Sequence, residues 1–532
     1  MKFLSSIVLL HLALYVQWVQ AQGFIKGVVY EDRNYNRQWD KGEPGVPHVA
    51  VSNGWEVVQT NSKGQYKIRL RDNEPVFVIK PSGYQVPMDE NHLPQFYHLN
   101  STVSHQLKYD TPEVSPLKGK ETNFALNAME NQDALRVLVI GDPQVSIQDD
   151  VNHLAKVLVE DVAYEKYDFA IVLGDLAFDE LDIYQSYKET AGALGVPVYN
   201  VIGNHDLNVD ASEDVFTDDT FEKHFGPSNY AFTFGNTHFI VIKNFQLTDQ
   251  GVPGVISEEV LEFVKNDLQF VPEDHKVVLA MHYPFEDVAN TGALLEIVHQ
   301  KHQAISLAGH THTNFQSFLP VDNANQKEHH QLVAGASCGS WWQGEHDFFG
   351  TPLAVMHCGA PKGYWFLDVV GDEYQFQFKA AGFPKSSQMH IWVPEWYDWD
   401  KKMNLPERHS RDTVKVNFYP GSERSTVSMR VDEGPWQPLQ YQPGKDPYYQ
   451  RLMRLQERGV YPTKTASKLG GSRDSRHLWV GTLPPDTPPG VHVIEVMASD
   501  PYSGTAKAKR VIRVYPQAEL KQKYKQMKTE EQ

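Results

Sequence analysis

Three short apolar runs, each ending in glycine and then a polar residue, constrain the fold of this chain more than any other feature. The runs cover residues 135–140, 167–173 and 196–202. Between them, apolar residues recur at helical spacing, at Val151, Leu154, Val157, Leu158 and Val162. The segment therefore predicts strand, helix, strand, helix, strand, which is the pattern of a parallel α/β sheet.

Polar residues follow the end of each run, namely Asp142, Asp175, Asn204 and His205. In open α/β sheets, functional groups collect just beyond the carboxyl ends of the strands, where the loops share a crevice. The glycine in each loop lets the backbone bend sharply and approach an ion closely. We therefore expect these four side chains to converge.

Two later strand-like runs also end in histidine. Residues 276–281 lead into His282, and residues 304–308 lead into Gly309, His310, Thr311 and His312. Neutral imidazole together with carboxylate suits zinc, iron or manganese. The central part of the chain is therefore a candidate metal-binding α/β domain.

Taken in order, five blocks resemble the calcineurin-like metallophosphoesterase family, of the exported bacterial type with a β-sandwich domain on each side. The blocks are GDPQ, GDLAFD, GNHD, MHYP and GHTH, starting at residues 141, 174, 203, 281 and 309. The resemblance covers residues 134–374 and implies two packed sheets flanked by helices. It also implies two divalent or mixed-valence transition-metal ions, either zinc, manganese or iron.

The resemblance assigns ligands to each ion. Asp142, Asp175 and His312 would bind one ion, and Asp175, Asn204, His282 and His310 the other. One carboxylate, that of Asp175, would bridge ions ~3.5 to 4 Å apart. The reaction implied is hydrolysis of a phosphoester by a hydroxide that bridges the ions.

His205 is not assigned to a metal and is the candidate acid that protonates the leaving group, with Asp206 next to it as the group that orients it. One departure from the family concerns Gln144, since many relatives have histidine there. Glutamine offers a neutral amide oxygen, a weaker ligand, so whether Gln144 binds metal stays open. The alternative function is a non-catalytic surface-binding module with a degenerate metal site, and Gln144 is the feature in its favour.

The length of 532 residues predicts about three or four domains of ~100 to 200 residues each. Residues 1–21 have Lys2, an apolar stretch and a small-residue end at Ala21, which predicts a secretory signal peptide and export to the periplasm or the medium. No other segment is long and apolar enough for the ~20 residues of a transmembrane span. The remaining domains are expected to be a β-sandwich at 22–129, an immunoglobulin-like β domain at 375–517 and a polar tail at 518–532.

The net charge of −18 and the absence of a basic stripe argue against a nucleic-acid polymer as partner. The expected substrate is a phosphorylated small molecule, a lipid headgroup or a glycan. No cluster of arginines marks a doubly charged terminal phosphate, which favours a phosphodiester slightly over a phosphomonoester.

A second candidate metal site lies in the first domain. Counted from Asp32, oxygen-bearing side chains stand at positions 1, 3, 5, 9 and 12 of a short loop, in the pattern of a calcium loop: Asp32, Asn34, Asn36, Asp40 and Glu43. Arg37 stands where such a loop normally has glycine. The stretch resembles the opening repeat of bacterial surface modules of the carboxypeptidase-regulatory and SdrD B-like type. The alternative is a polar hairpin loop.

Only two cysteines occur, Cys338 and Cys358. An exported protein meets oxidising conditions, which favours a disulfide between them over two buried thiols.

Overall fold

The computed structural model describes residues 23–516 except 104, 133, 301, 323–326, 349, 395–412 and 458–467, together with residues 519 and 522. The predicted signal peptide lies outside the described residues, as does nearly all of the predicted tail. None of the described helices has both the length and the apolar character needed to cross a membrane.

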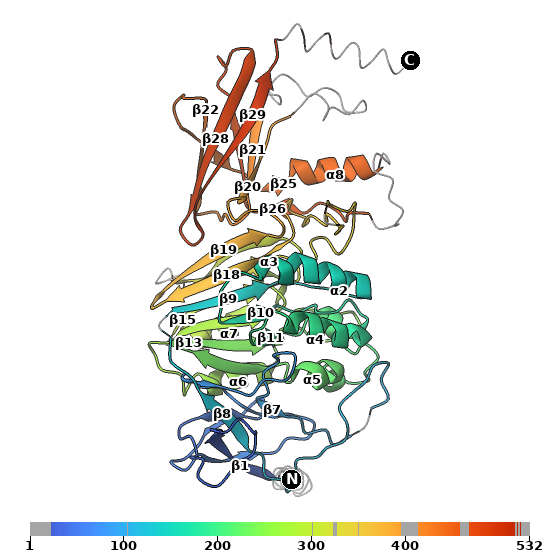
Figure 1. Ribbon diagram of the computed structural model, residues 1–532, viewed down its shortest axis with the longest axis vertical. Coiled ribbons are helices and arrows are strands. Elements are labelled where there is room, and N and C mark those ends of the chain that lie inside the picture. The colour runs from blue at the N-terminus through green and yellow to red at the C-terminus, as the bar shows by residue number, and fades with distance from the viewer. Residues whose placement is uncertain are drawn as a thin grey trace, which may run out of the picture.

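The described chain forms three parts that follow one another along the long axis of the molecule (Figure 1). The N-terminal part, in blue, occupies one end, and the C-terminal part, in orange and red, occupies the other. The central part between them contains two sheets and most of the helices. This confirms the predicted multidomain fold, with an α/β domain between two strand-rich domains.

The N-terminal part has two four-stranded sheets. One has the order β4-β1-β8-β6, with β1 (Phe24–Glu31), β4 (Gln65–Arg69), β6 (Tyr84–Gln85) and β8 (Phe124–Ala128). The other has the order β3-β2-β5-β7, with β2 (Ala50–Ser52), β3 (Val57–Gln59), β5 (Val76–Val78) and β7 (Tyr97–His98). Alternate residues of β4, Tyr66 and Ile68, are buried while their neighbours are exposed, as expected for a strand with one face on a core.

The first central sheet contains the three strands predicted from the sequence. Its order is β11-β10-β9-β18-β19, with β9 (Ala134–Ile140), β10 (Phe169–Val172), β11 (Val198–Asn200), β18 (Gly363–Val370) and β19 (Glu373–Ala380). Strand β10 runs parallel to both β9 and β11, whereas β18 runs antiparallel to β9. The segments α2 (Gln148–Leu154), a π-helical turn (Ala155–Val159) and α3 (Glu160–Val162) connect β9 to β10. Helix α4 (Tyr184–Gly192) lies between β10 and β11 along the chain.

The second central sheet has the order β12-β13-β14-β15-β17-β16, and β13, β14, β15 and β17 run parallel. Its strands are β12 (Tyr230–Phe234), β13 (Thr237–Ile242), β14 (Lys276–Met281), β15 (Gln303–Ala308), β16 (Asn314–Asp322) and β17 (Lys327–Ala334). The helices of this half are α5 (Asp219–Phe225), α6 (Glu258–Asp267) and α7 (Thr291–His299). Aromatic rings join the two sheets: Phe169 of β10 stacks on Phe234 of β12, with 4.6 Å between ring centroids.

The C-terminal part again has two four-stranded sheets. One has the order β20-β21-β27-β24, with β20 (Met389–Trp392), β21 (Thr413–Phe418), β24 (Gln440–Tyr441) and β27 (Leu478–Thr482). The other has the order β23-β22-β28-β29, with β22 (Thr426–Val431), β23 (Gln437–Pro438), β28 (Gly490–Asp500) and β29 (Gly504–Val514). The C-terminal part also contains a short pair of strands, β25 (Gly444–Lys445) and β26 (Asp474–Ser475), and helix α8 (Pro447–Glu457). These elements lie at the end of the C-terminal part that faces the central part (Figure 1).

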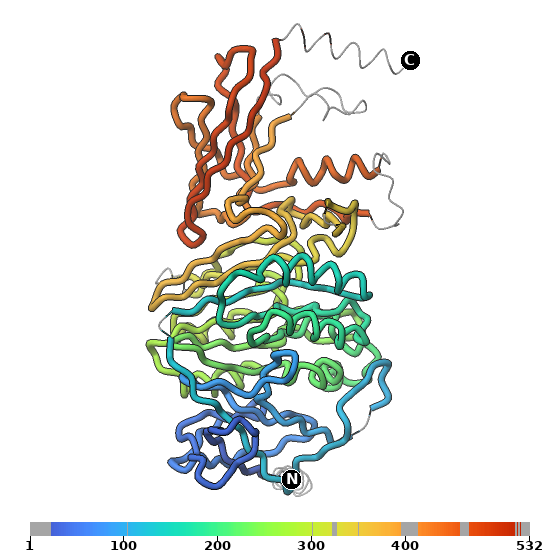
Figure 2. Tube along the Cα trace, in the orientation of Figure 1, coloured from blue at the N-terminus to red at the C-terminus, as the bar shows by residue number. Residues whose placement is uncertain are grey.

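Both outer parts are hydrogen-bonded to the central one through buried groups. Lys80 donates from Nζ to the carbonyl of Thr233 at 2.5 Å, and Asn314 donates from Nδ2 to the carbonyl of Tyr419 at 2.7 Å. The segment between β7 and β8 leaves the N-terminal part and runs along the central one (Figure 2). There Tyr109 donates from its hydroxyl to the carbonyl of Asp179 at 2.5 Å.

Candidate metal centre

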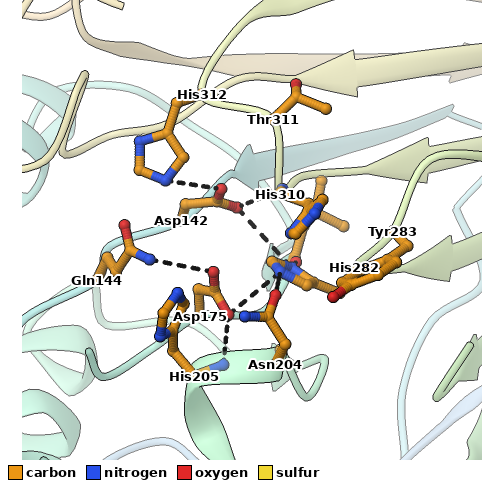
Figure 3. Close-up of polar contacts among 12 residues, drawn as sticks. Asp142, Gln144, Asp175, Asn204, His205, His282, Tyr283, His310, Thr311 and His312 are labelled. Atoms are coloured by element: carbon orange, nitrogen blue, oxygen red, sulfur yellow. Dashed lines mark hydrogen bonds and ion pairs between the residues drawn. The ribbon is translucent and has the colours of Figure 1, made fainter. Parts of the chain in front are cut away.

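Five strand ends bring the predicted ligands to one place (Figure 3). Asp142 follows β9, Asp175 follows β10 and Asn204 follows β11, while His282 follows β14 and the loop after β15 carries His310 and His312. The predicted convergence at the carboxyl ends of the strands is thus present in the structure, with both sheets contributing.

The backbone is strained at this centre. A positive φ is uncommon in residues other than glycine and costs on the order of 1–3 kcal/mol when the surrounding structure imposes it. Yet φ is positive at five of the predicted site residues, Asp142, Gln144, Asp175, His310 and His312. The loops therefore keep a costly conformation that directs these side chains to a common point.

Glycine is required beside the ligands because the backbone comes too close for a side chain. A Cβ on Gly203 would lie 2.0 Å from the amide nitrogen of Asp175, and one on Gly309 would lie 2.2 Å from Asp142 Oδ1. The glycines noted in the sequence thus act by allowing contact between neighbouring loops.

One group of ligands gathers around Asp175. His282 Nε2 lies 3.2 Å from Asp175 Oδ1 and 3.1 Å from Asn204 Oδ1, while its Nδ1 lies 2.8 Å from the carbonyl of Leu173. Burial alone would lower the pKa of His282, but the neighbouring carboxylate of Asp175 raises it to about 9. A cation bound here would compensate the same carboxylate. A backbone carbonyl on Nδ1 is the usual way to orient a metal-binding imidazole.

A second group gathers around Asp142. Asp142 Oδ2 lies 3.5 Å from His312 Nε2, and His312 Nδ1 lies 2.6 Å from the carbonyl of Gly339. Burial raises the pKa of Asp142 to about 8 and lowers that of His312 to about 3. His312 is thus neutral, donates from Nδ1 and presents the lone pair of Nε2 to Asp142.

Gln144 lies beside the predicted bridging carboxylate. It donates from Nε2 to Asp175 Oδ2 at 3.2 Å, and its backbone N–H donates to the carbonyl of Asp175 at 2.8 Å. The described contacts of Gln144 therefore orient Asp175. Its direct binding to metal stays an open prediction.

His205 lies next to these ligands and is paired with Asp179. Its Nδ1 lies 2.8 Å from Asp179 Oδ1, and its ring packs on Phe178 with centroids 4.7 Å apart. Burial alone would lower the pKa of His205, but the hydrogen bond to Asp179 and the charges of Asp175 and Asp179 raise it. The imidazole is partly exposed, so a substrate can reach it.

The prediction that Asp206 orients His205 is wrong. Asp206 is fully buried, and its carboxylate accepts from the backbone N–H groups of Leu176, Ala177 and Gly203 and from the hydroxyl of Tyr184. Successive side chains of the 3₁₀ turn Asn204–Asp206 point in different directions, so Asp206 binds the loop after β10 while His205 faces the centre.

The residue that sequence reasoning missed is Asp179, the last residue of the GDLAFD block. The sequence did contain a sign of it, because Asp179 is a second carboxylate in the same loop as Asp175. Tyr109 was also not predicted, and it holds the backbone of Asp179 from a distant part of the chain.

Three family models match the chain. They are described as the N terminal of Calcineurin-like phosphoesterase, matched at residues 33–111, Calcineurin-like phosphoesterase, matched at 135–314, and the C terminal of Calcineurin-like phosphoesterase, matched at 331–505. The chain belongs to the calcineurin-like phosphoesterase family. This membership supports a metal-dependent phosphoric ester hydrolase, and the N- and C-terminal parts are those that accompany the catalytic domain in the family.

Solved structures are also similar to this calcineurin-like phosphoesterase. One is the purple acid phosphatase PPD1 from yellow lupin (Lupinus luteus) seeds, at 12% identity and a TM-score of 0.35, covering 63% of this chain and 67% of that chain. Another is a metallophosphoesterase from Sphaerobacter thermophilus, at 14% identity and a TM-score of 0.21, covering 46% of this chain and 89% of that chain. No curated protein matches in sequence.

The centre fits the metal site that this family implies. One ligand atom each from Asp175, His282 and His310 lies within 4.8 Å of the others, which is close enough to surround an ion. Asp142 Oδ2 is buried with no hydrogen-bond partner among the described residues. A buried carboxylate oxygen is costly unless something compensates it, and a cation would do so.

The predicted disulfide is absent, since Cys338 and Cys358 are both free and buried. Cys338 Sγ lies 3.8 Å from Gln144 Oε1 and 3.8 Å from His312 Nδ1, whereas Cys358 donates to Asn314 Oδ1 at 3.3 Å. Each thiol therefore packs against its own neighbours near the metal centre. Sequence alone could not reveal this, because pairing depends on the directions of the two side chains.

The candidate calcium loop is folded around its own polar groups. Asp32 accepts from the backbone N–H groups of Asn36 and Arg37, and Asp40 Oδ2 accepts from the side-chain amides of Asn34 and Asn36. Glu43 accepts from the backbone N–H groups of Arg33 and Asp40. Arg37 has a φ of 61°, the conformation that glycine usually adopts at this position. Calcium binding here stays a prediction.

If the loop binds calcium, adding the ion to the full-length protein should raise its Tm. An ion at about 100 times its Kd stabilises the folded state by ~2.7 kcal/mol. Asp40→Asn should abolish the shift, because Asp40 supplies a charged ligand, whereas Asp72→Asn, at an exposed site outside the loop, should retain it. A shift of equal size in Asp40→Asn would favour the polar hairpin interpretation.

Proposed function

We propose that this chain is an exported phosphoesterase that hydrolyses a phosphodiester, or a phosphomonoester, at two metal ions. The observation that supports it is the meeting of two buried carboxylates with the imidazoles of the loops after β14 and β15. Asp142, Asp175 and His312 would hold one ion, and Asp175, Asn204, His282 and His310 the other. Export with loss of residues 1–21 is part of this proposal, and the intact mass of the exported protein tests it.

When bound, the ions would offset the charge of the phosphoryl oxygens and lower the pKa of a water molecule. The chain's own residues supply the remaining steps. His282 joins the two groups of ligands, since its Nε2 lies 3.2 Å from Asp175 Oδ1 and its Nδ1 lies 4.0 Å from Asp142 Oδ1, and Gln144 orients the Asp175 carboxylate through Oδ2. The positive-φ loops fix these ligands in advance, which reduces the reorganisation that the reaction requires.

His205 is the proposed acid for the leaving group. Asp179 accepts from Nδ1, which leaves the proton on Nε2 to be given to the departing oxygen. Among the described residues, Nε2 has no hydrogen-bond partner of its own. Tyr109 holds the backbone of Asp179 and thereby positions the pair from the N-terminal part.

Aromatic residues form walls beside the centre. Phe178 packs on His205, and Trp341 packs on His312 with ring centroids 4.8 Å apart. Arg473 of the C-terminal part donates to the carbonyl of Thr311 at 2.7 Å. This single guanidinium would pair with one anionic phosphoryl oxygen. A phosphodiester carries one negative charge, so the arrangement supports a diester as substrate. The leaving group would belong to a small phosphorylated molecule, a lipid headgroup or a glycan.

Hydrolysis of two model substrates tests the proposal. The purified protein should contain transition metal and should hydrolyse bis-p-nitrophenyl phosphate faster than p-nitrophenyl phosphate. The reverse order would replace the diester by a monoester. A protein without bound metal that hydrolyses neither compound would instead support the non-catalytic binding module.

A further inference from the structure

A cavity of about 290 Å³ lies at the end of the second central sheet where its strands begin. Lys276, Gln303 and Lys327 are the first residues of the neighbouring strands β14, β15 and β17, and all three line it. His282 and His310 follow the opposite ends of β14 and β15. The cavity is therefore separated from the metal centre by the length of the strands.

The C-terminal part closes the other side of this cavity. Arg424 and Tyr502 line it, and Tyr502 belongs to the turn between β28 and β29, which points toward the central sheets in Figure 1. The carbonyl of Tyr502 accepts from the backbone N–H of Phe376 at 2.8 Å. The cavity thus lies between two parts of the chain that are bonded to each other.

The charges that line the cavity are mainly positive. Lys276, Lys327 and Arg424 are cations, and the one carboxylate in the lining, Glu328, is paired with Arg424. The lining therefore carries a local excess of positive charge in a chain of net charge −18, and a bound anion would balance it.

The hydrogen bonds of the two lysines among the described residues go to neutral acceptors. Lys276 donates from Nζ to the carbonyl of Asp372 at 2.9 Å and to Gln303 Oε1 at 3.4 Å. Lys327 donates from Nζ to the carbonyl of His299 at 2.7 Å. Neither ammonium has a carboxylate within ion-pair distance in the described part of the chain. Burial lowers the pKa of Lys276, although the charges of Asp372 and Glu373 oppose this.

A buried histidine adds an unused polar atom. His299 is 8% exposed and lines the cavity, and its Nδ1 has no hydrogen-bond partner among the described residues. Its Nε2 lies 2.9 Å from His329 Nδ1, and His329 Nε2 lies 2.9 Å from Ser306 Oγ. When Ser306 donates to His329 and His329 donates to His299, a hydrogen remains on His299 Nδ1. This nitrogen is itself buried, so His299 forms part of the wall of the cavity and is not a donor at its surface.

The remaining walls are fixed by aromatic contacts. Tyr502 stacks on Tyr374 with ring centroids 5.5 Å apart, and the guanidinium of Arg424 lies 3.5 Å from the centre of the Phe318 ring. His330 bonds to both Tyr374 and Gln316 through its two ring nitrogens. The cavity is therefore preformed, which reduces the entropy lost on binding.

We propose that this cavity binds a small oxyanion of the phosphate class, with Lys276 and Lys327 as its donors and His299 in its wall. The anion is either free phosphate or the phosphate group of a small organic ester, since the volume leaves room beyond the oxyanion itself. The site is separate from the metal centre, and it does not depend on the proposed hydrolysis.

Calorimetric titration with inorganic phosphate tests this inference in the full-length, chelator-treated protein, because removing the metals suppresses phosphate binding at the centre. The variant Lys276→Gln with Lys327→Gln should bind at least ~10-fold more weakly than the unaltered chain, because it loses both charged hydrogen-bond donors. Lys265→Gln is the matched control, because Lys265 is exposed on α6 and paired with Glu262. It should bind phosphate like the unaltered chain.

A second measurement avoids dependence on the folding of the double variant. Phosphate should protect Lys276 and Lys327 of the unaltered chain from reductive methylation, followed by peptide mass spectrometry, and leave the labelling of Lys265 unchanged. Glycerol 3-phosphate in place of phosphate distinguishes the two sources, since tighter binding identifies an organic ester and weaker binding identifies free phosphate. Equal phosphate affinity in the double variant, or labelling of both lysines unchanged by phosphate, would overturn the inference.

Discussion

The Asp175→Asn variant is expected to lose at least ~100-fold in turnover on bis-p-nitrophenyl phosphate. In the structure, Asp175 Oδ1 accepts from the backbone N–H of His205 and faces His282, while Oδ2 faces Gln144. Asparagine has nearly the same shape, but it lacks the charge and one of the two oxygens. Both ions should therefore bind more weakly. Turnover and metal content of the purified variant, measured together, check this expectation.

Asp182→Asn is the matched control. Asp182 is exposed and lies seven residues after Asp175, in the connection between β10 and α4. Its variant should keep both activity and bound metal. The proposed bridging role of Asp175 would be contradicted if Asp175→Asn retained its full metal content and turned over at the normal rate.

The second large effect is expected for His205→Ala, which should reduce turnover by at least ~100-fold because general acid catalysis contributes ~10²–10⁴-fold. The loss should depend on the leaving group. p-Nitrophenolate departs readily without a proton, whereas an alkoxide does not, so an alkyl phosphodiester should lose more than bis-p-nitrophenyl phosphate. Comparing the two substrates in the same preparation checks this result. An equal loss on both would argue against His205 as the acid.

The partner of His205 can be tested with two further variants. Asp179→Asn should lower turnover without changing Tm, and it should have little further effect when His205 is already alanine, because the two residues act as one unit. Asp206→Asn should instead lower Tm, since its carboxylate accepts three backbone N–H groups inside the protein. Normal turnover in Asp179→Asn, or an unchanged Tm in Asp206→Asn, would contradict the role given to that residue.

The fold of the central domain could be predicted because its signals are local. An apolar run that ends in glycine is read directly from neighbouring residues, and the parallel arrangement of β9, β10 and β11 then places Asp142, Asp175 and Asn204 at one edge. The histidines of the loops after β14 and β15 reach the same centre because the second sheet packs against the first, as in the contact between Phe169 and Phe234. Residue type and chain topology were sufficient for this level of description.

The side-chain partners could not be predicted in the same way. Asp206 is adjacent to His205 in sequence but points into the protein, whereas Asp179 reaches His205 from another loop. Likewise, a disulfide between Cys338 and Cys358 was predicted only because an exported protein meets oxidising conditions. In the structure, each thiol contacts different groups. Such outcomes depend on the direction of a side chain after a turn, which adjacent residues do not specify.

The sequence by itself determined which strands form the central sheets and which residue types stand at their ends, because hydrophobic patterning and the conformational freedom of glycine act over a few residues. Only the tertiary structure decided that Asp179 holds His205, and that Lys276, Lys327 and His299 share a cavity closed by the C-terminal part. These arrangements join residues far apart in the chain, and their formation depends on how whole sheets pack and on which buried charges find partners.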